Sequence, residues 1–231
     1  MKGLLFSEPM VKAWMAGNKT ITRRIMNPQP EWEEYPGFCQ DGIWRGRYRD
    51  LTYDGCDYVV EVWEAKPRYT AGETVYIKEG WRIGAWKEDG QCVAVDYRAD
   101  GFARKEWLLV PDEEMFERLW IQSTDDAIKA GLKMDCDGQY HWEPGQSPCR
   151  WRAPRFMPEW AARRHALIVS VIPERLQEIN EIDAYLEGFR DQLRGDTFYS
   201  VGAQFKETWD KLHPGTWDKN PWVWRIELEK I

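Results

Sequence analysis

The chain lacks long apolar runs, a secretory leader and a paired set of cysteines. Within its 231 residues no apolar stretch approaches the length of a bilayer span, and only three apolar residues separate Gly3 from Ser7. The five cysteines are odd in number and irregularly spaced, so they do not form a disulfide framework. We therefore expect a cytoplasmic protein with reduced cysteines and no membrane partner.

Common catalytic and metal-binding motifs are also missing. The sequence contains no glycine-rich phosphate loop and no G-x-S-x-G elbow. Metal-ligating side chains gather only at Asp135, Cys136, Asp137, His141 and Cys149, and their spacing matches neither a zinc site nor an EF-hand loop. We expect a polar turn there, and we expect no metal and no cofactor.

The net charge of −7 argues against a protein that coats nucleic acid, because such binding depends on neutralising phosphates. A local basic segment is nevertheless present. Residues 150–165 contain one glutamate, Glu159, against five arginines: Arg150, Arg152, Arg155, Arg163 and Arg164. This separation of charge favours a surface with one cationic face. The chain also has fifteen tryptophans, most of them expected in the core and a few beside the basic segment, where they could stack on a base.

Residues 17–24, Gly-Asn-Lys-Thr-Ile-Thr-Arg-Arg, carry the most chemistry in the fewest residues. The glycine and asparagine favour a turn, and the β-branched residues after them favour a strand. Alternation along that strand places Thr22 and Arg24 on one face and Ile21 on the other. Lys19 and Thr22 are three residues apart, so they face the same way only if Lys19 belongs to the turn.

This segment resembles the G-x-K-T-x-x-x-R signature of ASCH-domain proteins, a family with a PUA-like β-barrel fold. Further blocks resemble the larger ASCH proteins often carried by prophages: residues 72–81, 157–161, 166–189 and 220–224. The resemblance implies an α+β protein, a PUA-like mixed β-barrel with peripheral helices. It also implies a single domain over residues 1–231, with long insertions at about 26–71 and 82–155.

The residue pattern predicts several elements along the chain. A helix over 9–16 should precede the strand of residues 20–25, and an irregular insertion with a hairpin should follow. The apolar run 166–172 predicts a strand buried on both faces. Asn180 should cap a helix that buries Ile182, Tyr185, Leu186 and Phe189, and Ser200 should cap another. Strands are also expected over 73–79, 93–97 and 222–229, short helices over 112–120 and 125–130, and a loop over 131–155.

Some small ASCH proteins deacylate N4-acylated cytidines with a lysine, a threonine and a glutamate. The resemblance places these roles on Lys19, Thr22 and Glu187. Thr22 would be the nucleophile and Lys19 its base, provided that burial or the neighbouring Arg23 and Arg24 lower the lysine pKa from about 10.4. Glu187 would orient the amine or pass the proton to the leaving group.

The resemblance also implies a cationic cleft that holds a nucleoside, a modified base or RNA. We expect it to be lined by Arg23, Arg24, Glu79, Trp81, Arg155 and Trp160, although an outward, surface position for Arg23 is equally open. The alternatives are a binding module for RNA or a modified base without turnover, a ribonuclease in which a lysine and an arginine stabilise the phosphorane, and a structural protein of phage assembly. Protein partners and oligomeric state stay open.

Overall fold

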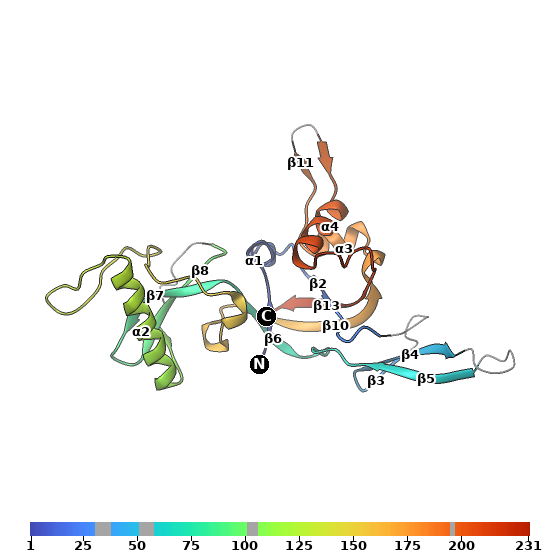
Figure 1. Cartoon of the computed structure of the whole chain (residues 1–231), viewed down its shortest axis with the longest axis horizontal. Coiled ribbons are helices and arrows are strands. Elements are labelled where there is room, and N and C mark those ends of the chain that lie inside the picture. The colour runs from blue at the N-terminus through green and yellow to red at the C-terminus, as the bar shows by residue number, and fades with distance from the viewer. Residues whose placement is uncertain (31–37, 51–57, 101–105, 195–196) are drawn as a thin grey trace. The chain divides into compact units, whose positions relative to one another are not determined.

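The computed structural model describes residues 1–30, 38–50, 58–100, 106–194 and 197–231. The chain divides into two compact units (Figure 1). Unit 1 comprises Met1–Lys12 and Val75–His165, and unit 2 comprises Ala13–Thr74 and Ala166–Ile231. Both units combine helices with sheets, so the predicted α+β class is confirmed. The single domain with two insertions stays a prediction. No helix in the described ranges has the length and apolar character needed to cross a bilayer.

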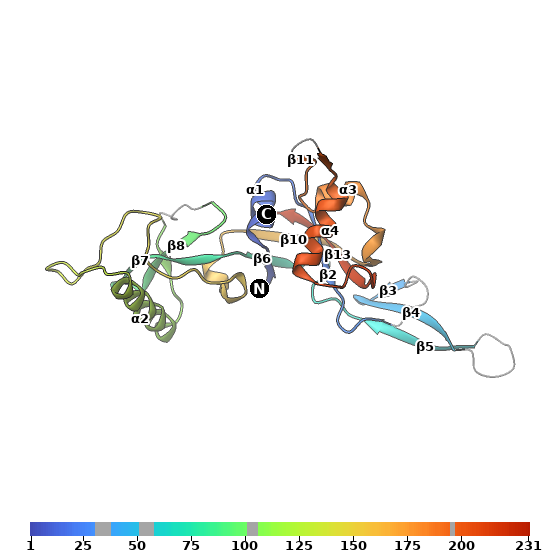
Figure 2. The same ribbon diagram turned by 45° about the horizontal axis from the view of Figure 1, so that its top comes forward.

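Unit 1 contains a parallel strand pair and an antiparallel sheet. Strand β1 (Lys2–Leu5) pairs in parallel with β6 (Thr74–Lys78). The antiparallel sheet has the order β7 (Trp81–Lys87), β8 (Cys92–Tyr97), β9 (Leu108–Leu109). Helix α2 (Glu113–Lys129) lies beside β7 (Figure 2). The core of this unit includes Phe116 of α2 together with Ile83 and Val95 of the sheet. Three further elements begin in this unit: helix α1 (Glu8–Met15) and the 3-10 turns η1 (Pro154–Phe156) and η2 (Glu159–Ala161).

Helix α2 replaces the two short helices expected in this region. Its first turn is capped by Asp112, whose Oδ1 accepts a hydrogen bond from the Met115 backbone N–H at 2.7 Å. The polar residues between the two expected helices do not interrupt it, because the Ser123 hydroxyl donates to the Leu119 carbonyl oxygen at 2.7 Å. The prediction of two helices was therefore wrong, while the expected start of the first helix near residue 112 was correct.

Unit 2 is organised around an antiparallel sheet. In this sheet β13 (Trp222–Lys230) pairs with β10 (His165–Arg175) on one side and with β2 (Ile21–Ile25) on the other. Helices α3 (Glu181–Leu186) and α4 (Val201–Leu212) contact each other, and Ser200 caps α4 as expected. The core includes Leu176, Phe205, Trp209 and Val223. The remaining elements are η3 (Leu176–Glu178), the hairpin β11 (Gln192–Arg194)–β12 (Thr197–Tyr199), and the sheet β3 (Phe38–Gln40)–β4 (Ile43–Asp50)–β5 (Tyr58–Ala65).

Three expectations about the strands need correction. The run 166–172 is not buried on both faces, because Val169 is 44% and Ile172 37% exposed. Val169 points outward by simple alternation with the buried Ile168, and an irregularity in the pairing of β10 with β13 between Ile168 and Ser170 then shifts the alternation, so that Val171 is buried and Ile172 exposed. Among the residues that the structure describes, no set of paired strands closes into a barrel. The insertion after β2 forms a three-stranded sheet rather than one hairpin, with residues 31–37 and 51–57 outside the described ranges.

The cap of α2 gives a direct test of the fold of unit 1. Asp112→Ala removes the acceptor for the Met115 N–H, and we expect the free energy of unfolding to fall by about 1 kcal/mol. Asp112→Asn retains a capping oxygen and should lose much less. Urea unfolding followed by circular dichroism measures both. Equal losses in the two variants would contradict a capping role.

Candidate functional site

Lys19 lies in the interior of unit 2, where its amine contacts Glu187. The lysine is 0% exposed and the glutamate 4%. The Lys19 Nζ donates to Glu187 Oε2 at 2.5 Å, to the Glu187 carbonyl oxygen at 3.0 Å and to the Ile21 carbonyl oxygen at 2.7 Å. Two residues that the sequence placed in one site, 168 positions apart, therefore form a buried ion pair.

The backbone explains why these two side chains meet. Gly17, with φ +77°, turns the chain after α1, and Lys19 then forms an isolated antiparallel bridge with Glu187. The Thr20 N–H donates to the Leu186 carbonyl oxygen at 2.8 Å, which extends this pairing by one residue. Helix α3 ends at Leu186, so Glu187 is its C-terminal cap rather than a residue on its flank.

Gly188 permits the close approach of these segments. It has φ +103°, and a Cβ atom added there would lie 2.6 Å from the Ala13 Cβ and 3.4 Å from the Lys19 Cβ. Only glycine combines this backbone conformation with so little space. The Glu-Gly pair at the end of a short helix was the sequence signal for this junction.

Arg23 is buried beside the same glutamate rather than facing outward. It is 2% exposed, and its Nη1 lies 3.3 Å from Glu187 Oε1. The guanidinium also bonds Glu174 and Asp183. Strand alternation places Arg23 on the same face of β2 as Ile21. This face therefore carries a charged side chain as well as an apolar one. The surface alternative for Arg23 is therefore wrong, and its predicted part in a ligand site stays open.

Three residues of this cluster were missed in the sequence: Glu174, Asp183 and Arg225. Arg225 lies 3.3 Å from Asp183 and 4.0 Å from Glu174, so the three carboxylates of Glu174, Asp183 and Glu187 face the three cations Lys19, Arg23 and Arg225. Asp183 is drawn inward by the two arginines, while Ile182, expected in the core, is 70% exposed. The prediction that this helix buries Ile182 was wrong for that reason, whereas Tyr185 and Phe189 pack against the core as expected.

Burial and neighbouring charges move several pKa values in the cluster. Burial lowers the pKa of Lys19, with smaller contributions from Arg24 and Arg23, and the Glu187 carboxylate only partly opposes it. Burial raises the pKa of Glu174 despite Arg23. Burial alone would also raise the pKa of Asp183, but the hydrogen bond and charge of Arg225 and Arg23 lower it. The amine of Lys19 therefore holds its proton more weakly than an exposed lysine does.

Thr22 is fully buried on the other face of β2. It is 0% exposed, and its Oγ1 makes no hydrogen bond to any residue that the structure describes, Lys19 included. The neighbouring Arg24 donates from Nη1 to the Arg23 carbonyl oxygen at 3.3 Å, and burial lowers its pKa. The strand register opposes Thr22 to Ile226 and Arg24 to Trp224 on β13. The structure therefore places Lys19 and Glu187 in contact and leaves the Thr22 hydroxyl without a partner.

The other predicted lining residues lie in unit 1, where most have partners of their own. Glu79 is 1% exposed and receives two hydrogen bonds from Arg163, at 2.8 and 2.9 Å. Trp81 is 2% exposed in the core, with the Trp160 ring at 6.0 Å in an edge arrangement. Arg155 is exposed and lies over the Phe156 ring. A shared cleft of these residues with Lys19 stays a prediction.

The basic segment is less cationic in the fold than along the sequence. Arg150 pairs with Asp126, and Arg163 pairs with Asp100 as well as Glu79. The turn at Asp135 is polar, as expected. Asp135 Oδ1 accepts from the Asp137 and Gln139 N–H groups at 2.9 and 2.8 Å, and Oδ2 lies 2.5 Å from His141 Nε2.

Comparison of the chain with models of protein families, with curated proteins and with solved structures finds no match. The ASCH resemblance consequently rests on residues 17–24 and the flanking blocks alone.

Gly188 offers a test of the Lys19–Glu187 junction. Gly188→Ala should lower the free energy of unfolding by more than about 1 kcal/mol, because an alanine at positive φ is strained and its Cβ meets Ala13. Gly202 is the matched control: it lies in the first turn of α4 with nothing within 4 Å of an added Cβ, so Gly202→Ala should instead be neutral or stabilise by about 0.5–1 kcal/mol. Thermal unfolding of both variants measures the contrast. A change in the free energy of unfolding of the same sign in both variants would contradict close packing around Gly188.

Proposed function

We propose that this protein is an ASCH-type, PUA-like protein that recognises a nucleobase, nucleoside or RNA, and that it hydrolyses an N-acylated cytidine amide at Lys19, Thr22 and Glu187. The observation that carries the proposal is a fully buried amine held by a buried carboxylate, three residues from a buried hydroxyl that has no described partner. A stable core alone has no need of a buried hydroxyl that makes no hydrogen bond to the described residues. The resemblance of residues 17–24 to the ASCH signature assigns Lys19 and Thr22 to amide chemistry, and the resemblance of the block 166–189 assigns Glu187.

In the proposed reaction Thr22 Oγ1 attacks the acyl carbonyl carbon and its proton passes to neutral Lys19. The C–N bond of the tetrahedral intermediate then breaks, and the cytidine N4 leaves with the proton carried by Lys19. Water hydrolyses the threonine ester and regenerates the hydroxyl. Glu187 keeps the amine oriented through its 2.5 Å hydrogen bond.

The reaction needs an unprotonated amine, and the surroundings of Lys19 favour one. Burial penalises the ammonium form, and Arg23 and Arg24 add to that penalty. Glu187 is shared with Arg23, whose Nη1 lies 3.3 Å from Oε1, so its negative charge is not reserved for the lysine. The buried positions of Lys19 and Thr22 mean that substrate reaches them only when covering side chains move.

Recognition without turnover is the second candidate. It is favoured by the missing hydrogen bond between Thr22 Oγ1 and Lys19, since a catalytic base normally bonds its nucleophile. In some enzymes, however, this bond forms only when the substrate binds. Incubation with N4-acetylcytidine separates the two functions. An amidohydrolase releases cytidine and acetate, and a binding module shows affinity for the nucleoside without release. Absence of both would contradict either function.

Thr22 supplies a test in which stability and activity separate. Thr22→Val keeps the size of the side chain and removes an oxygen that has no described partner, so we expect the free energy of unfolding to be unchanged or to rise by up to about 1 kcal/mol. Hydrolysis of N4-acetylcytidine should fall at least about 100-fold. Thr22→Ser, which keeps the hydroxyl, should retain measurable hydrolysis. An undiminished rate in Thr22→Val would remove Thr22 from the reaction.

The pH dependence of the rate tests the role of Lys19. Because burial lowers the lysine pKa below its ordinary 10.5, the neutral fraction grows as pH rises through that lowered value, and the rate should rise with it. Lys19→Arg keeps the positive charge but cannot accept the proton, so hydrolysis should be lost at every pH. Lys12→Arg, at an exposed helix position, is the control and should leave the profile unchanged. A flat profile in the unmodified protein would contradict a lysine base.

A further inference from the structure

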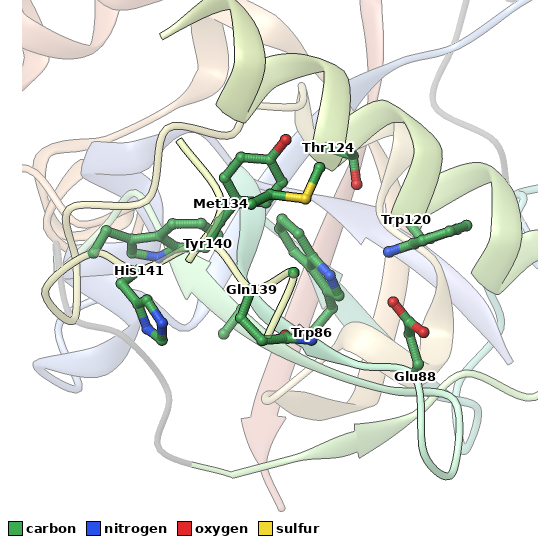
Figure 3. A pocket seen from close by; sticks show the side chains of 11 residues that line it. Trp86, Glu88, Trp120, Thr124, Met134, Gln139, Tyr140 and His141 are labelled. Atoms are coloured by element: carbon green, nitrogen blue, oxygen red, sulfur yellow. The ribbon is translucent and has the colours of Figure 1, made fainter. Parts of the chain in front are cut away.

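Unit 1 contains a cavity lined by eleven residues, four of which are tryptophan or tyrosine (Figure 3). Its volume is about 200 Å³, and residues of β7, α2 and the loop 134–142 line it. Pockets for drug-sized ligands occupy roughly 300–1,000 Å³, so this cavity suits a small chemical group rather than a whole nucleotide. None of its residues belongs to the Lys19 cluster.

Four aromatic side chains form the walls: Trp86, Trp120, Tyr140 and Trp142. The Trp142 indole N–H donates to the Gly84 carbonyl oxygen at 2.7 Å, and the Trp86 and Trp142 rings lie 5.3 Å apart at 50°. Trp86 and Trp120 also pack against the core of unit 1. The aromatic faces are therefore held in place before any ligand binds.

The cavity carries negative rather than positive charge. Its lining residues include one carboxylate, Glu88, and one imidazole, His141, which is already paired with Asp135. The Glu88 carboxylate makes no ion pair with the residues that the structure describes. No lysine or arginine is among the described residues that line the cavity. A phosphate would find no cation here, whereas a cation would find aromatic faces and a carboxylate.

We propose that this cavity binds a methylated ammonium group. The aromatic rings contact its methyl groups, and the Glu88 carboxylate balances its charge. A primary ammonium fits less well, because its three N–H donors would lose water and meet mainly ring faces. A quaternary ammonium has no donors to satisfy and is attracted to ring faces by their negative quadrupole. This inference is independent of the chemistry proposed at Lys19.

Choline and its neutral isostere 3,3-dimethylbutan-1-ol test the proposal on the full chain. Proton NMR titration follows the ligand methyl resonance, which aromatic rings shift upfield on binding. Choline should give a saturable shift, with a dissociation constant about ten-fold lower than that of the neutral isostere. Glu88→Gln and Trp120→Leu should each weaken choline binding about three-fold or more.

Controls lie outside the cavity. Trp107→Leu removes an exposed tryptophan and Glu229→Gln an exposed carboxylate, and neither should alter choline binding. Circular dichroism verifies that each variant is folded, and Trp86 is left intact because it packs against the core. The proposal is overturned by equal affinity for choline and its isostere, by no choline binding, by tighter binding of cytidine than of choline, or by unchanged choline affinity in both cavity variants.

Discussion

The ion pair of Lys19 with Glu187 is the interaction on which the architecture of unit 2 depends. It joins the turn after α1 to the end of α3, two segments 168 residues apart in sequence. Both side chains leave water, so the pair is stable only because every proton of the amine has an acceptor and the carboxylate has a second cation, Arg23. Removal of one partner from such a buried pair typically costs about 3–5 kcal/mol, since the other charge is left without compensation.

The same electrostatics explain why one stretch of sequence misled. Asp183 and Ile182 are neighbours on α3, and hydrophobicity alone would bury the isoleucine. Arg23 and Arg225 reverse the outcome, because two buried guanidiniums without carboxylates would cost more than one exposed isoleucine. Glu174 completes the balance from β10. Charge pairing across the sheet therefore fixes which face of the short helix points inward.

Local sequence patterns predicted individual helices and strands, but they did not predict which residues pair across long sequence distances. Alternation and capping residues located β2, β8, β13 and α4 within one or two residues, because these signals lie inside each element. The meeting of Lys19 with Glu187 was anticipated only through the ASCH resemblance. Arg225 and Glu174 gave no signal, since an arginine on a polar strand face and a glutamate at a strand end are ordinary surface residues until a partner buries them. The irregularity that exposes Ile172 likewise arises from pairing with β13 and not from the apolar run itself.

Thr22 separates the structural from the functional demands on this cluster. The Lys19–Glu187 pair and the arginines around it could serve stability alone, because each charge is compensated. The Thr22 hydroxyl cannot be explained in that way, since a buried polar atom without a hydrogen bond costs about 1–3 kcal/mol relative to an apolar atom of the same shape. Valine would fill the same space opposite Ile226 without that cost. A buried hydroxyl that has no partner among the described residues, three positions after Lys19 in the sequence, is therefore the feature that most favours a chemical role.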